Sequence, residues 1–224
     1  SKAVVEACGS GDVHEVIRVL NNTNMYFLIA SLRKFSSKFA KMLKRPKTSR
    51  RYRNLLGFSP LISRWVRASK LAECPRMQEA FYAGLFDGKD SFVADYLDLL
   101  ITAILEKDEH WVHHVHAAAV VLRHITARLG RTFLDAKDNA GVLDRVERAA
   151  AVFLGELCSE GTLSTPGGPE TALWCLGYTY PYIVPLVSAA DFASAVVDVV
   201  HKAREDRSLR PMLARFIGSI YGSV

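Results

Sequence analysis

The spacing of hydrophobic residues predicts helices along almost the whole chain. Between residues 24 and 43, apolar side chains recur at intervals of three and four, at Leu28, Leu32, Phe35, Phe39 and Met42. This is the period of a helix with one buried face. The same pattern, bounded by Gly, Pro and short polar runs, predicts further helices at Pro60–Glu73, Arg76–Phe86, Ser91–Lys107, Glu109–Leu129, Ala140–Ser159, Glu170–Tyr178, Ala189–Arg204 and Leu209–Tyr221.

These segments predict an all-α fold, because no strand-like alternation is sustained over a useful length. About ten helices with mostly short connections are typical of a compact orthogonal bundle or of armadillo/HEAT-like stacked helix hairpins. We predict a single all-α domain over residues 1–224. A finer division would separate a basic N-terminal subdomain, residues 1–72, from a mildly acidic helical remainder, residues 73–224.

One stretch of twenty residues, Thr171 to Ala190, carries no charge. Its length is sufficient for a membrane span. However, Gly177, Pro181 and Pro185 interrupt it, and proline ends or kinks a helix. We therefore predict a buried helix, a turn and a second helix, with the first helix ending at Tyr178.

The charge of the chain is distributed unevenly. The formal net charge is +6, yet residues 16–72 contain fourteen Lys and Arg and no Asp or Glu. The preceding fifteen residues carry a net charge of −2, and residues 73–224 carry −6. An asymmetry of this size concerns binding partners more than the fold.

The basic residues follow the predicted helix at residues 24–43 and the connection after it. Lys34, Lys38, Lys41 and Arg45 recur at the helical period opposite the apolar face, and Pro46 begins an exposed connection. The candidate binding residues are Lys34, Lys38, Lys41, Arg45, Lys47, Arg50, Arg51 and Arg53. Tyr52 and Trp65 lie in the same block and could stack on bases.

This basic block predicts an acidic partner. We expect a non-enzymatic interaction or scaffold module that binds an acidic macromolecular partner, either an acidic protein segment or nucleic acid. The alternative is a helical nucleocapsid-type protein that binds RNA or single-stranded DNA, with the basic block lining a groove. Self-association through basic N-terminal and acidic C-terminal surfaces is a further option. An anionic membrane surface ranks behind these partners.

The predicted helix Glu109–Leu129 holds five of the seven histidines. His110 and His114 have the i, i+4 spacing that can place two metal ligands on one helical face. A metal-dependent enzyme that uses His110, His113 and His114 as ligands is the weakest alternative, because the sequence contains no HExxH motif and no third ligand is evident beside the His110/His114 pair. We therefore predict no metal and no cofactor, and expect these histidines to be solvated or to contact a neighbouring helix.

The remaining chemistry of the sequence is limited. No P-loop, nucleophile elbow or dinucleotide-binding motif is complete, so we name no catalytic residue and predict no enzyme activity. The four cysteines, Cys8, Cys74, Cys158 and Cys175, form no CxxC pair. They predict reduced thiols in an intracellular protein, cytoplasmic or nuclear.

Overall fold

The computed structural model describes residues 2–72, 82–86, 90–132 and 140–221. It forms two compact units, residues 1–120 and 121–224, and the boundary falls inside one helix. The described residues are helical with no strand, which confirms the all-α prediction. The choice between an orthogonal bundle and stacked hairpins stays a prediction. Within these described ranges, no helix has both the length and the apolar composition that crossing a membrane requires.

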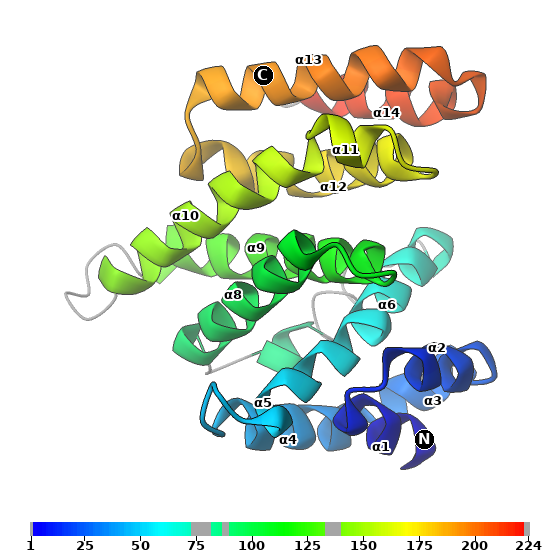
Figure 1. The fold of residues 1–224 in the computed structure, drawn as a ribbon, viewed down its shortest axis with the longest axis vertical. Helices are drawn as coiled ribbons and strands as arrows, with labels where there is room; N and C mark the ends of the chain where they lie inside the picture. Colours follow the sequence, from blue (N-terminus) through cyan, green and yellow to red (C-terminus); the bar gives the residue numbers. More distant parts are fainter. Residues whose placement is uncertain (1, 73–81, 87–89, 133–139, 222–224) are drawn as a thin grey trace. The chain divides into compact units, whose positions relative to one another are not determined.

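The first unit contains the N-terminal helices and the start of the helix that crosses the boundary (Figure 1). Its elements are α1 (Lys2–Ser10), α2 (Val13–Asn21), α3 (Met25–Ala30), α4 (Leu32–Leu43), α5 (Arg50–Arg53), the 3-10 helix η1 (Asn54–Phe58), α6 (Ser59–Ala72), α8 (Asp90–Glu106) and α9 (Trp111–Thr132). The boundary lies within α9 and not near residue 72, where the charge changes, because α8 packs against α4 and η1.

The core of the first unit is built around the ring of Phe39 on α4. This ring makes edge contacts with Phe58, Phe86 and Tyr96, at centroid distances of 5.1, 5.7 and 5.0 Å. All four side chains are buried. Such aromatic pairs add to the stabilisation that comes from removing the rings from water. The apolar period of the sequence thus correctly identified the buried face of α4.

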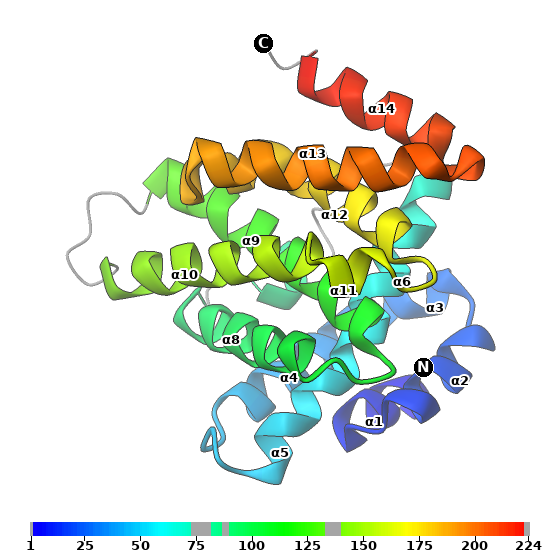
Figure 2. The same ribbon diagram turned by 45° about the horizontal axis from the view of Figure 1, so that its top comes forward.

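The second unit contains the rest of α9 and the C-terminal helices. Its other elements are α10 (Ala140–Leu157), α11 (Glu160–Leu163), α12 (Gly168–Ile183), η3 (Val184–Leu186), α13 (Ala189–Glu205), η4 (Arg207–Leu209) and α14 (Arg210–Tyr221). Helices α12, α13 and α14 pack against one another, and Figure 2 shows α13 in orange and α14 in red. The Arg123 guanidinium lies over the rings of Tyr178 and Tyr182, 4.6 and 5.0 Å from their centroids, and so joins α9 to α12.

Several predicted boundaries are wrong. The helix predicted over residues 24–43 is divided at Ser31, whose N–H donates to the carbonyl of Leu28 in a three-residue turn. Helix α12 does not end at Tyr178 but continues to Ile183, because Pro181 lies in its last turn, where few hydrogen bonds depend on it. The predicted helix Arg76–Phe86 lies mostly outside the described residues.

A glycine and a helix cap form the turn between α1 and α2. Gly11 has φ +78°, a conformation that favours glycine, and it separates α1 from α2. The Asp12 side chain then accepts a hydrogen bond from the N–H of Glu15, at 3.0 Å, and caps α2. This cap places His14 in the first turn of α2.

We predict that Phe39→Ala strongly destabilises the protein. The substitution removes a fully buried ring and leaves a cavity between three other aromatic side chains. The free energy of unfolding should fall by about 3–5 kcal/mol, as measured by urea denaturation. Phe27→Ala is the matched control, because Phe27 is 60% exposed. Equal losses in the two variants would contradict the assignment of Phe39 to the core.

Candidate anion-binding surface

The exposed face of α4 is basic. At 100° per residue, Arg33, Lys34, Lys38, Lys41 and Lys44 fall within an arc of about 140°, opposite the buried apolar face. Four of these five residues are exposed, and Lys38 is half-buried. Arg33 and Lys44 were missing from the sequence candidates, although the helical period that selected Lys41 also selects Lys44. The polar side of α4 therefore presents only positive charge and serine.

Lys38 is less exposed than its neighbours because its stem packs on α1. A Cβ atom placed at Gly9 would meet Cε of Lys38. The absence of a side chain at Gly9 thus lets the lysine lie close to the α1 backbone. Long lysine stems commonly cover apolar surface while the charged group reaches water. Lys38 consequently has a packing role as well as a charge.

The connection after α4 is exposed at most positions, as the sequence predicted, and it contains one short helix, α5. The Ser49 side chain accepts a hydrogen bond from the N–H of Tyr52, at 3.2 Å, and caps α5. Within this single turn, Tyr52 is buried while Arg50, Arg51 and Arg53 are exposed. The helical turn thus buries one aromatic side chain and exposes three arginines.

Asp95 of α8 holds this connection in place. Its backbone carbonyl accepts a hydrogen bond from the Tyr52 hydroxyl at 2.9 Å. Its carboxylate lies 2.6 Å from Nζ of Lys47. The Asp95 side chain is only 16% exposed, whereas Lys47 is 61% exposed. Two contacts with one residue therefore attach the arginine-rich connection to the body of the first unit.

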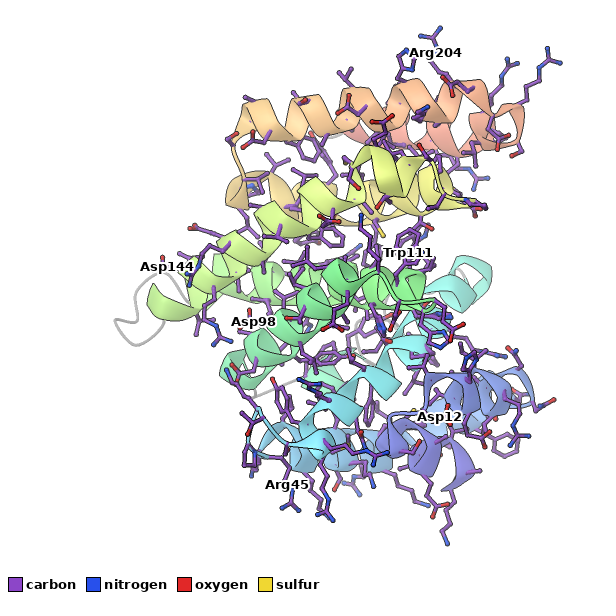
Figure 3. The ribbon with its side chains drawn as sticks, in the orientation of Figure 1. Asp12, Arg45, Asp98, Trp111, Asp144 and Arg204 are labelled. Atoms are coloured by element: carbon purple, nitrogen blue, oxygen red, sulfur yellow. The ribbon has the colours of Figure 1, made fainter. Side chains whose placement is uncertain are left out.

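Lys47 forms an ion pair with Asp95, whereas the other predicted cations have no such partner among the described residues. Among the described residues, no carboxylate lies within ion-pairing distance of Lys34, Lys38, Lys41, Arg45, Arg50, Arg51 or Arg53. Figure 3 shows Arg45 beside α4 and α5, with its side chain directed away from the ribbon. Here the basic surface means Lys34, Lys38, Lys41, Arg45, Arg50, Arg51 and Arg53. Charges of one sign without local counter-charges produce a positive potential that attracts polyanions.

The predicted stacking residues do not belong to this surface. Tyr52 and Trp65 are each 4% exposed. Tyr52 points inward because its hydroxyl bonds to Asp95, and Trp65 lies in the core of the first unit. The expectation that these two rings stack on bases is therefore not met. A basic sequence block with interspersed aromatic residues does not reveal which of them face the core.

The three predicted metal candidates are not brought together. His113 and His116 approach the Ser63 hydroxyl through their Nδ1 atoms, at 3.3 and 3.0 Å. His114 is buried between Ser59, 2.8 Å from its Nδ1, and Asp108, 3.3 Å from its Nε2. His110 instead lies beside His14 and Glu109. Contact with a neighbouring helix, one of the two expectations for these histidines, is thus confirmed for His113, His114 and His116.

Serine, histidine and aspartate also line up in catalytic triads, but this arrangement differs from them. In a triad the serine meets Nε2 and the carboxylate meets Nδ1, whereas His114 has the opposite order. Ser59 is fully buried and also donates to the carbonyl of Leu56. These contacts orient the imidazole within the core. Burial lowers the pKa of His114, and the nearby Asp108 carboxylate opposes that effect.

The described cysteines are free thiols. Cys8 and Cys175 are buried and Cys158 is half-buried, while Cys74 lies outside the described residues. Burial raises the pKa of Cys8 and of Cys158 to about 12. Thiols with such pKa values stay protonated at neutral pH and are poor nucleophiles.

Comparison with known proteins adds no further assignment: no family model, no curated protein and no solved structure matches this chain.

We predict that Tyr52→Phe loosens the connection between α4 and α5. The substitution keeps the buried ring but removes the hydrogen bond to the Asp95 carbonyl. The free energy of unfolding should fall by about 0.5–1.5 kcal/mol, and limited trypsin digestion should cleave faster at Arg50 and Arg51. Tyr180→Phe provides a control on a half-buried tyrosine of the second unit. Unchanged cleavage at the two arginines would show that the tyrosine does not anchor the connection.

We also predict that His114 makes the protein less stable in mild acid. Its pKa in the folded state lies below the unfolded value of about 6.5, so the unfolded state binds the proton first as the pH falls. The stability that depends on neutral His114 is fully present above the pKa of the unfolded state. It is lost as the pH falls through the lower pKa of the folded state. Glu106, Asp108 and His110 are the charged groups that influence His114.

This prediction is measured by urea unfolding at a series of pH values in buffer with a chelator. His114→Asn should flatten the loss of stability below about pH 6.5, while remaining less stable than the parent at neutral pH. His201→Asn, at an exposed histidine of α13, should retain the parent profile. Parallel profiles for the parent and His114→Asn would exclude His114 as the source.

Proposed function

We propose that this chain is a non-enzymatic interaction module, cytoplasmic or nuclear, whose basic surface binds an acidic segment of a partner protein. The observation that carries the proposal is the set of exposed cations on α4, Arg45 and α5, for which the described residues supply no paired carboxylate. Protein surfaces usually mix both signs of charge. A block of 57 residues without an acid, folded so that its cations face outward, favours a partner that supplies the negative charge.

The arrangement of the cations supports recognition of an extended acidic chain. Helix α4 has twelve residues, and at 1.5 Å per residue its basic face is roughly 18 Å long. The arginines of α5 continue the positive charge beyond the C-terminal end of α4, on a connection held by Asp95. Several carboxylates or phosphates along one segment could therefore be neutralised together. Arginine adds paired N–H donors that suit such groups.

The buried aromatic rings favour an acidic protein over single-stranded nucleic acid. Proteins that bind single strands usually combine a basic groove with rings on which bases stack. Tyr52 and Trp65 are 4% exposed and supply no such ring. Contacts with phosphate alone would give mainly non-specific, salt-dependent affinity. Nucleic acid, a second copy of the chain and an anionic membrane are therefore outcomes that the experiment must separate from an acidic protein segment.

The test compares two variants with equal loss of charge. The first neutralises the basic surface with Lys34→Gln, Lys41→Gln, Arg50→Gln and Arg51→Gln, and leaves Lys38 in place because its stem packs near Gly9. The control carries Arg204→Gln, Arg207→Gln, Arg210→Gln and Arg215→Gln, at exposed positions of the second unit. Fluorescence anisotropy is measured with a labelled peptide rich in Asp and Glu at several salt concentrations. The first variant should weaken binding by about ten- to a hundredfold, and the control should retain the parent affinity.

The same titration identifies the alternatives. Labelled single-stranded RNA and double-stranded DNA of the same total charge as the peptide are measured in parallel. Much tighter binding of a nucleic acid, lost in the first variant, would replace the acidic protein with nucleic acid as the partner. Equal weakening in both variants would show that only net charge matters and would overturn the assignment to α4 and α5. Sedimentation of the protein alone and flotation with anionic vesicles test self-association and membrane binding.

A further inference from the structure

Two histidines and a glutamate converge at the N-terminal end of α2. His14 lies in the first turn of α2, after the Asp12 cap, while Glu109 and His110 lie in the turn between α8 and α9. Nε2 of His14 is 2.9 Å from Oε1 of Glu109, and Nε2 of His110 is 3.6 Å from the same oxygen. The two imidazole rings meet edge to face at a centroid distance of 4.5 Å. One ligand atom from each residue lies within 4.8 Å of the other two.

These separations suit a small divalent metal ion. Tetrahedral coordination with metal–ligand bonds of about 2.0–2.1 Å places neighbouring ligand atoms about 3.3–3.4 Å apart. The two nitrogen–oxygen distances, 2.9 and 3.6 Å, lie on either side of this value. The two imidazole nitrogens lie within 4.8 Å of each other, so side-chain rotations that bring them closer would place all three ligand atoms around one ion. Two imidazoles and one carboxylate form a donor set that zinc and neighbouring transition metals prefer.

Of the three candidate ligands, His110 is mostly buried, whereas His14 and Glu109 are exposed to solvent. The His110 side chain is 14% exposed, and its backbone N–H donates to Oδ1 of Asp108 at 2.8 Å. His14 and Glu109 are each 71% exposed, so an ion has a path from solvent and room for a water as fourth ligand. Sequence reasoning selected His110 but missed His14, which lies 95 residues from Glu109 in the chain.

We propose that His14, Glu109 and His110 form a binding site for a divalent transition metal, with Zn²⁺ as the best match. The site connects α2 with the turn between α8 and α9, both in the first unit. A metal that binds the folded state but not the unfolded chain stabilises the fold. The ion therefore acts as a cross-link between segments distant in sequence. This proposal does not depend on a function for the basic surface.

The experiment uses the full chain after removal of metal with a chelator. ZnCl2 binding is measured by isothermal titration calorimetry, and CoCl2 titration reports tetrahedral ligand geometry through its visible absorption. We expect one ion per chain and a melting temperature that rises when Zn²⁺ is added. His14→Gln and Glu109→Gln should each weaken Zn²⁺ binding by about tenfold or more. Both should reduce the rise in melting temperature at a given ZnCl2 concentration.

The controls separate this site from other ligands of the chain. His201→Gln removes an exposed histidine that pairs with Glu205 in α13, and it should bind Zn²⁺ like the parent. All the cysteines remain in every variant, so binding by thiols would persist in His14→Gln. The ligand positions of His14 and Glu109 are exposed, and circular dichroism checks that both variants fold. Parent affinity in either variant, or no saturable binding by the parent, would overturn the site and leave only a hydrogen bond between His14 and Glu109.

Discussion

The ring of Phe39 packs against Phe58, Phe86 and Tyr96, and this contact determines which side of α4 faces the core. A helix that buries one face must expose the opposite one, and on α4 the opposite face carries the lysines and Arg33. The energy of burying the aromatic rings is therefore also what directs the positive charges into solvent. The packing of Phe39 therefore determines both the hydrophobic core of the first unit and the side of α4 on which the candidate anion-binding surface lies.

The connection between α4 and α5 depends on the same packing. Because α8 lies against α4, Asp95 comes within reach of both Tyr52 and Lys47. The segment with the most arginines is thus attached by a tyrosine hydroxyl and one lysine. Pre-organisation of this kind reduces the conformational entropy that the connection loses when a partner binds. The ion pair between Lys47 and Asp95 thus helps to position the exposed arginines of α5.

Sequence and structure agree best where the determining interactions are local. The helical period located both the buried apolar face and the basic face of α4. Sequence reasoning failed for Tyr52 and Trp65, because composition alone does not reveal whether an aromatic residue within a basic block faces the core. It also failed to connect His14 with His110, since no local pattern joins residues so far apart in the chain.

By itself, the sequence determined that the chain is helical, where most helices lie, and that one block of it is strongly basic. These properties follow from periodicity and composition, which act over a few turns of helix. The tertiary structure decided which cations are paired, which rings are buried, and which histidines meet a serine or a glutamate. The reason is physical: these contacts join side chains from different helices, and they exist only after packing has brought the helices together.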